Sequence, residues 1–307
     1  MNWKVKLVLA FAKFQKPLGD ATDTDIKTMR KKAEQAVKIG SFLYDSKQKV
    51  YSAMDKSING IGCRIYKPSD KNNLPVMIYY HGGGFVLYGL DSHDLVCRRL
   101  CNMNQCIVVS VDYRLAPEHT FPAAHLDAWS VLSWVFENVA ELGGSASIII
   151  LAGDSAGANL AACMAHKAKE QKLTIAAQVL VYPWVDGKLS NPSISRNGEG
   201  YMLTKEKMFW FQEKYTPNID ERCHPDVSPI YKENFEGLAP AIVITAEYDP
   251  LIDDGAEYYK KLVSAGVPAE YKEYKGLIHG FFNLPKVAPE AIRAYEDIRD
   301  FLRGKLS

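Results

Sequence analysis

The sequence lacks a long apolar run, a strong net charge and a closely spaced cysteine pair of the C-x-x-C type. A membrane-spanning helix needs about 20 consecutive apolar residues, so we expect no stable membrane insertion. The formal net charge of +1 gives no field that would attract nucleic acid. No cofactor or metal is predicted.

The cysteines are scattered, and Cys97 and Cys101 have no matching histidine pair nearby, which argues against a zinc site. Near the N-terminus, Lys4 and Lys6 precede a short apolar segment, but Lys13 and Lys16 interrupt it. We therefore predict an amphipathic helix rather than a signal peptide. The expectation is a cytoplasmic protein with reduced, mostly buried thiols. The six cysteines are Cys63, Cys97, Cys101, Cys106, Cys163 and Cys223.

With 307 residues, 47% hydrophobic and 24% charged, the chain can bury a large core. No internal repeats or low-complexity tracts occur. Short apolar runs alternate with helical patterns, which predicts a mostly parallel sheet with helices on both faces. The predicted strands are 61–66, 76–80, 107–111, 148–152, 178–182, 241–246 and 269–275, and the main predicted helices are 26–40, 124–138, 158–169, 254–265 and 288–304.

Two segments depart from this rhythm. Residues 1–50 hold eleven Lys or Arg against five Asp or Glu. They read as helical up to residue 45, with a turn at 16–20 and a helix-cap signal at 22–25. We favour a solvated helix face over an anionic membrane contact. Residues 187–235 carry no buried-strand signal and are rich in large apolar side chains, which indicates a helical insertion between two strands.

A sharp turn is predicted at Gly153-Asp154-Ser155-Ala156-Gly157, between an isoleucine-rich strand and an alanine-rich helix. This is the nucleophile-elbow pattern Gly-x-Ser-x-Gly. The crowded turn leaves no room for a side chain two residues before or after the serine. Ser155 is therefore a candidate nucleophile, provided that the chain supplies a base.

The candidate base is His279, because it lies on a glycine-flanked loop after the last predicted strand. A packing histidine is the alternative. The candidate acid that would orient it is Asp249, just past strand 241–246, with Glu247 as its rival. Asp253 and Asp254 fit better as carboxylates at the N-terminus of the next helix.

Three glycines follow strand 76–80 in His81-Gly82-Gly83-Gly84. Such a run lets backbone N–H groups approach a substrate oxygen closely, and the predicted oxyanion donors are the amides of Gly83, Gly84 and Ala156. A phosphate-binding loop is the alternative, but such a loop would need Lys followed by Ser or Thr at its end, and neither is present here. We interpret His81 as orienting the loop.

Together these segments resemble the hormone-sensitive-lipase-like branch of the α/β-hydrolase carboxylesterases. The other matching motifs are 112–119 (Asp-Tyr-Arg-Leu-Ala-Pro-Glu-His), 121–124 (Phe-Pro-Ala-Ala), Asp249-Pro250-Leu251 and His279-Gly280-Phe281. The resemblance implies an α/β-hydrolase fold with Ser155, His279 and Asp249 as the catalytic triad. It also implies a helical cap from 1–45 and 187–235 on a core of 46–186 and 236–307. Within 112–119, we expect Arg114 and Glu118 to form a buried ion pair.

The implied activity is that of a serine esterase on small-molecule esters. Apolar side chains near the glycine run and in the insertion suggest a pocket for short to medium acyl chains. The candidates are Phe85, Leu87, Tyr88, Met208 and Phe209. Packing of the cap is the alternative role for them. Amidase or lactonase activity and a non-catalytic ligand-binding relative are the alternative functions. The resemblance also implies a homodimer through the late strand, at 269–274.

Overall fold

The computed structural model describes residues 3–12, 25–33, 35 and 46–305. The predicted turn at 16–20, most of the cap signal and the end of the helix predicted at 26–40 lie outside these residues. Helix α1 spans Trp3–Ala12, and a second helix covers 25–33.

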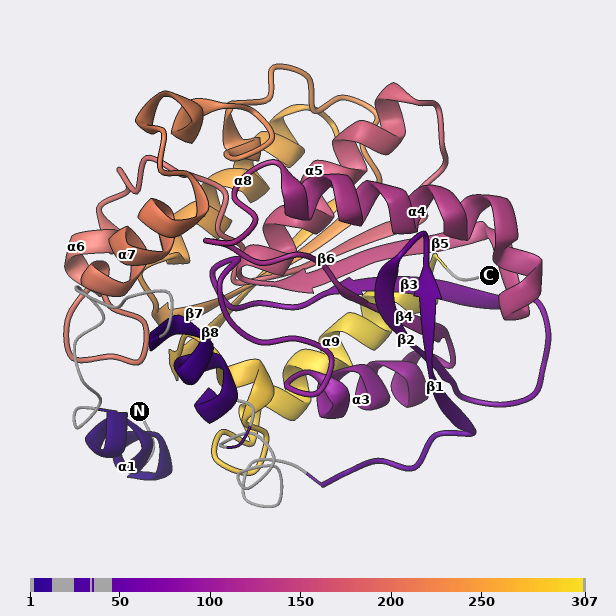
Figure 1. Cartoon of the computed structure of the whole chain (residues 1–307), viewed down its shortest axis with the longest axis horizontal. Coiled ribbons are helices and arrows are strands. Elements are labelled where there is room, and N and C mark those ends of the chain that lie inside the picture. The colour runs from indigo at the N-terminus through magenta and orange to yellow at the C-terminus, as the bar shows by residue number, and fades with distance from the viewer. Residues whose placement is uncertain (1–2, 13–24, 34, 36–45, 306–307) are drawn as a thin grey trace.

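Eight strands form one sheet in the order β1-β2-β4-β3-β5-β6-β7-β8 (Figure 1). β1 pairs with β2, and β2 with β4, in antiparallel fashion, and the other neighbours are parallel. The mostly parallel sheet predicted from the sequence is thereby confirmed. The strands are β1 Ser52–Ile58, β2 Ile61–Lys67, β3 Leu74–Tyr80, β4 Ile107–Asp112, β5 Gly144–Asp154, β6 Ala177–Val181, β7 Ala241–Tyr248 and β8 Ala269–Ile278.

Helices cover both faces of the sheet, as the alternating pattern predicted. α4, α5 and α8 enclose one apolar core, and α3 and α9 enclose the other. Their bounds are α3 Asp94–Asn104, α4 Ala123–Leu142, α5 Ala156–Glu170, α8 Ile252–Ser264 and α9 Glu290–Arg303, and a short 3-10 helix, η3, spans Phe281–Asn283.

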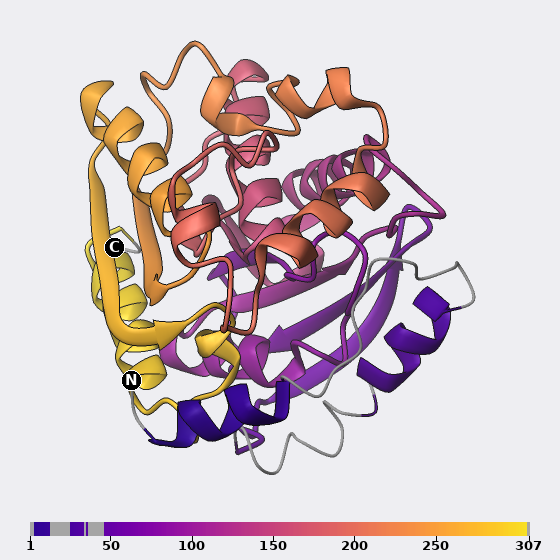
Figure 2. The same ribbon diagram turned by 90° about the vertical axis from the view of Figure 1, so that its left-hand side faces the viewer.

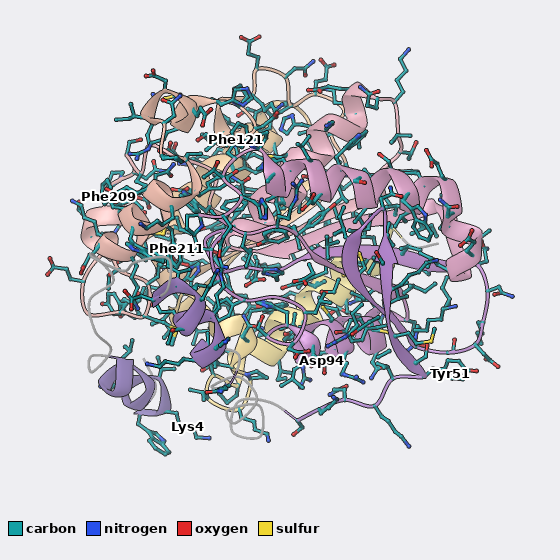
Figure 3. The ribbon with its side chains drawn as sticks, in the orientation of Figure 1. Lys4, Tyr51, Asp94, Phe121, Phe209 and Phe211 are labelled. Carbon is teal, nitrogen blue, oxygen red and sulfur yellow. The ribbon has the colours of Figure 1, made fainter. Side chains whose placement is uncertain are left out.

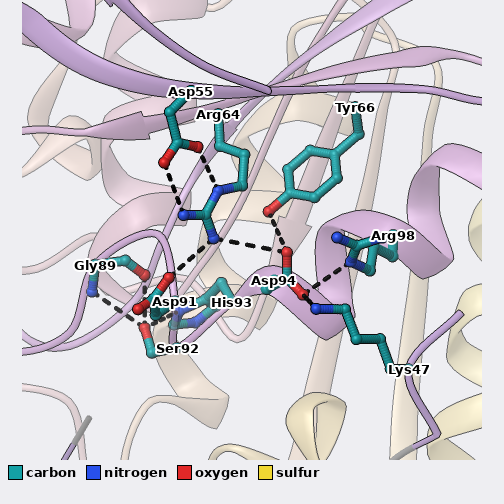
Figure 4. Close-up of polar contacts among 10 residues, drawn as sticks. All are labelled: Lys47, Asp55, Arg64, Tyr66, Gly89, Asp91, Ser92, His93, Asp94 and Arg98. Atoms are coloured by element: carbon teal, nitrogen blue, oxygen red, sulfur yellow. Dashed lines mark hydrogen bonds and ion pairs between the residues drawn. The ribbon is translucent and has the colours of Figure 1, made fainter. Parts of the chain in front are cut away.

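Strand β1 and helix α3 were not predicted. β1 is an edge strand with exposed positions, so its sequence lacks an apolar run. The start of α3 is held by ion pairs instead of by a side-chain cap (Figure 4). Asp94 accepts hydrogen bonds from Tyr66 and Arg98, at 3.0 and 2.8 Å. Arg64 contacts Asp94 at 3.6 Å and also pairs with Asp55 and Asp91.

The segment between β6 and β7 contains only helices and loops within the described chain. Its elements are α6 Ser193–Arg196, α7 Lys205–Tyr215 and the 3-10 helices η1 Ile219–Cys223 and η2 Pro229–Tyr231. α6 and α7 and the indigo N-terminal helices lie toward the same side of the molecule, which faces the viewer in Figure 2.

The strand order brings two loops together. β3 lies between β4 and β5, and Tyr80 at the end of β3 is in register with Gly153 of β5. In parallel sheets, the loops after neighbouring strands meet at the carboxyl edge, where ligands bind. The glycine run after β3 therefore lies beside the turn after β5.

Candidate active site

Ser155 occupies the turn between β5 and α5 with φ 54° and ψ −118°. This left-handed backbone is strained for a residue with a side chain, and such strain is typical of functional positions. A Cβ at Gly153 would lie 2.7 Å from the carbonyl oxygen of Tyr80, and one at Gly157 would lie 2.6 Å from that of His81. Both glycines are therefore needed because the turn packs directly against the end of β3.

The three predicted triad side chains lie within hydrogen-bond distance of one another. Nε2 of His279 is 3.1 Å from Oγ of Ser155, and Nδ1 is 2.7 Å from Oδ2 of Asp249. Asp249 is fully buried, and the amide of Leu251 donates to its other oxygen at 2.8 Å. Because an ionised carboxylate only accepts, Nδ1 carries the proton and Nε2 is free to accept from the serine hydroxyl.

The rival acids point elsewhere. Glu247 accepts from the amide of Gly276 at 2.6 Å. Asp253 and Asp254 lie in the first turn of α8, as predicted. Each also accepts a hydrogen bond from the 187–235 segment, Asp253 from the amide of Ser193 and Asp254 from Nδ2 of Asn191. Asp254 accepts from the amides of Val185 and Asp186.

The three predicted oxyanion donors are available. Within the described chain, the amides of Gly83, Gly84 and Ala156 donate to no protein acceptor. Ala156 begins α5, where the helix dipole favours negative charge. Gly83 and Gly84 have φ of 119° and 62°, conformations that favour glycine. This combination is what stabilisation of a developing oxyanion requires.

Asp154, whose role the sequence reasoning missed, joins the two loops. Its Oδ1 accepts from the amide of Gly82 at 2.9 Å and from the hydroxyl of Tyr79 at 2.7 Å. Nε2 of His93 lies 3.2 Å away. Burial raises the pKa of Asp154, but the neighbouring His93 and the hydrogen bonds from His93 and Tyr79 outweigh this and lower the pKa to about 2. Asp154 is therefore ionised at neutral pH.

His93 is held so that it donates to this carboxylate. Oγ of Ser92 donates to the carbonyl of Gly89 at 2.7 Å, and Nδ1 of His93 lies 2.8 Å from the same Oγ (Figure 4). This contact fixes the ring so that Nε2 faces the carboxylate of Asp154.

His81 lies behind the glycine run. Its ring stacks on Tyr113 with centroids 4.3 Å apart, and its Nδ1 donates to the carbonyl of Gly82 at 2.7 Å. Burial lowers the pKa of His81 to about 3, so the ring is neutral. These contacts support the prediction that His81 orients the loop.

The five residues predicted to bind substrate differ in their exposure and in what they pack against. Phe85 is 1% exposed, and its ring stacks on Tyr215 with centroids 3.8 Å apart, which accounts for the side chain without a ligand. Met208 is also buried, whereas Phe209 is 39% exposed. The backbone carbonyl of Leu87 and the ring of Tyr88 lie against Gly83. A substrate contact stays a prediction for all five.

A different side chain of α7 reaches the glycine run. The ring of Phe211 lies against Gly84, directly where a Cβ would stand, and Phe211 is 8% exposed. In Figure 3, Phe209 lies at the periphery and Phe211 farther in. Residues 208–211 are all large and apolar, so the sequence did not reveal which ring points inward.

The predicted ion pair between Arg114 and Glu118 is wrong. Arg114 instead binds both oxygens of Asp127 on α4, at 2.7–3.1 Å. Glu118 binds Arg30 of the 25–33 helix, at 2.8 and 2.9 Å. Each acid is reached by an arginine distant in sequence, so local spacing could not have identified the pairs.

Among the described residues, no group of His, Cys, Asp or Glu is arranged to hold a metal ion. None of the helices described is both long and apolar enough to cross a membrane. All six cysteines are free, and five of them are buried.

Comparison with known proteins agrees with this geometry. A family model described as alpha/beta hydrolase fold matches residues 77–283. Carboxylesterase NlhH of Mycobacterium tuberculosis is 44% identical over 242 residues, which are 77% of this chain and 76% of that protein. Ethyl acetate hydrolase of Pseudomonas putida is 35% identical over 74% of this chain and 73% of its own.

A solved structure covers nearly all of the chain. The hyperthermophilic esterase from the archaeon Pyrobaculum calidifontis superposes with a TM-score of 0.93 at 39% identity, over 99% of this chain and 98% of that one. Fold and sequence motifs thus agree over the whole catalytic region. The chain belongs to the α/β-hydrolase fold family, in its hormone-sensitive-lipase-like branch.

Proposed function

We propose that this protein is a serine carboxylesterase that hydrolyses short- to medium-chain acyl esters through an acyl-enzyme intermediate. The observation that carries the proposal is the unbroken chain of contacts from Ser155 through His279 to buried Asp249. The names of the two relatives and of the solved structure, which are all esterases or ester hydrolases, support the reaction class.

In the first step, Oγ of Ser155 attacks the ester carbonyl while Nε2 of His279 takes its proton. The carbonyl oxygen becomes an oxyanion, which the amides of Gly83, Gly84 and Ala156 stabilise. His279 then protonates the leaving alcohol. Water repeats the sequence on the acyl-enzyme and releases the acid. Asp249 holds the His279 tautomer and stabilises the imidazolium.

The acyl-chain preference is inferred from the cover over the oxyanion loop. Phe211 lies on Gly84 and limits the space beside the reacting carbonyl. The name of one relative, ethyl acetate hydrolase at 35% identity, agrees with small acyl groups. Leu87 and Tyr88, which lie beside Gly83, are the proposed wall of the acyl pocket.

Replacement of the nucleophile tests the proposal. Ser155→Ala should lower kcat for a p-nitrophenyl ester by at least about 10³-fold, because the serine acts together with its base. An unchanged melting temperature would show that the fold is intact. Hydrolysis at the wild-type rate by this variant would refute the assignment.

Two further properties are proposed. The free, mostly buried thiols support a cytoplasmic, reducing location, which fractionation would test. β8 lies at one edge of the sheet, so residues 269–274 are the proposed contact of a homodimer. Sedimentation velocity would measure it, and a monomer at micromolar concentration would contradict it.

A further inference from the structure

One guanidinium group connects the 25–33 helix to the loop that follows the glycine run. Nε of Arg30 donates to the carbonyl of Val86 at 2.7 Å, and Nη2 donates to that of Ala116 at 2.6 Å. The same guanidinium binds both oxygens of Glu118. Ile26, one turn earlier, is fully buried in the core. The helix is thus anchored by one apolar and one charged side chain.

The carbonyl of Val86 belongs to the oxyanion loop, and that of Ala116 belongs to the loop after β4, which is bonded to it. The amides of Val86 and Leu87 donate to the carbonyl of Gly83, at 3.1 and 2.9 Å, and close a tight turn. The amide of Ala116 donates to the carbonyl of Phe85 at 2.9 Å. A shift of residue 86 or 116 would therefore move the peptides of Gly83 and Gly84.

Arginine suits this task better than lysine. Its planar fork makes two parallel bonds to a carboxylate and still has donors left for carbonyls. The hydrogen bonds from Arg30 lower the pKa of Glu118, so the carboxylate is charged at neutral pH. The side chains are 19% and 32% exposed, so the pair by itself contributes little to stability. The pair matters more for where it holds the Arg30 guanidinium, which also binds the carbonyls of Val86 and Ala116.

We propose that Arg30 is a positioning residue for the oxyanion loop: docking of the 25–33 helix fixes the peptides of 83–86 so that their amides face the transition state. The proposal rests on the esterase function proposed above. It assigns the 25–33 helix a part in catalysis beyond covering the site. An oxyanion donor stabilises the transition state and does not act on substrate binding, so the effect is expected in kcat.

The test compares Arg30→Ala, Arg30→Lys and wild type on p-nitrophenyl esters from acetate to octanoate. Active sites are counted by organophosphate titration, so that kcat refers to folded enzyme. We expect Arg30→Ala to lower kcat about tenfold or more with KM nearly unchanged. The factor should be the same for every acyl length. Arg30→Lys should not restore kcat, because it lacks the fork. The matched control is Lys31→Ala, which removes an equal charge from an exposed position of the same helix and should match wild type.

Two results would overturn the proposal while leaving the esterase function in place. One is an unchanged kcat per active site in Arg30→Ala, even with a lower melting temperature. The other is a loss that appears in KM and grows with acyl length, which would make the helix a pocket wall. Absence of ester turnover in wild type and Lys31→Ala alike would instead remove the esterase function, and this inference with it.

Discussion

Asp154→Asn is the substitution that most sharply separates the proposed roles of the turn residues. It keeps the size of the side chain but removes the charge that binds the Gly82 amide, the Tyr79 hydroxyl and His93. Asp154 is 3% exposed, so water cannot replace these partners. We expect losses in both stability and catalysis, of separate origin.

The stability loss follows from the pKa of this carboxyl. The decrease from 3.8 to about 2 corresponds to roughly 2.5 kcal/mol of stabilisation at neutral pH. For a chain of 307 residues, this is a decrease of roughly 4 °C in melting temperature. The folded pKa lies below the unfolded one, so the contribution is complete above pH 4 and disappears as the pH falls toward 2. The difference between variant and wild type should be constant from pH 5 to 8 and smaller at pH 3.

The catalytic loss follows from the position of Gly82. Without the carboxylate, the glycine run loses its bond to the turn that carries Ser155, and we expect kcat to fall by about 10- to 100-fold. Asp127→Asn is the control, because Asp127 is an equally buried carboxylate paired with Arg114. It should lower the melting temperature and leave kcat per active site unchanged. An unchanged kcat in Asp154→Asn, or a stability loss of equal size at pH 3, would refute the reasoning.

Two further substitutions address the cover of the site and the support of the acid. Phe211→Ala removes the ring on Gly84. The variant should prefer esters with longer acyl chains, as measured on an ester panel, and its unfolding free energy should fall by about 3 kcal/mol, as measured by chemical denaturation. An unchanged chain-length profile would count against Phe211 as the limit of the pocket. Asn197→Ala removes the amide that donates to the carbonyls of Glu247 and Asp249, each at 3.0 Å. We expect the unfolding free energy to fall by about 1–3 kcal/mol and kcat to fall because Asp249 is displaced. A kcat equal to wild type would show that the loop holds Asp249 without Asn197.

The sequence alone identified the residues that now lie in hydrogen-bond contact at the carboxyl edge of the sheet. Ser155, Asp249 and His279 each follow a predicted strand, so their meeting follows from the parallel sheet. Local backbone demands also appear in sequence, since Gly153 and Gly157 are required by close packing against β3.

Contacts between segments far apart in sequence were not predictable. Glu118 is bound by Arg30 and Asp127 by Arg114, although Arg114 and Glu118 are neighbours in one motif. Likewise, Phe211 contacts Gly84 only because the insertion folds back over β3. Such pairs depend on tertiary placement, which hydrophobic periodicity does not encode. The polar start of α3 and the edge strand β1 were missed because neither carries an apolar run: ion pairs hold the start of α3, and backbone pairing with β2 holds β1.

The most direct measurement of the central claim is covalent labelling by diethyl p-nitrophenyl phosphate, followed by mass spectrometry of the digested protein. The account predicts one phosphoryl group per chain on Ser155, with loss of ester hydrolysis in proportion to labelling. Labelling should be much slower in His279→Ala, because the base that activates the serine is absent. Modification of another residue, or equal labelling of Ser155→Ala, would contradict it.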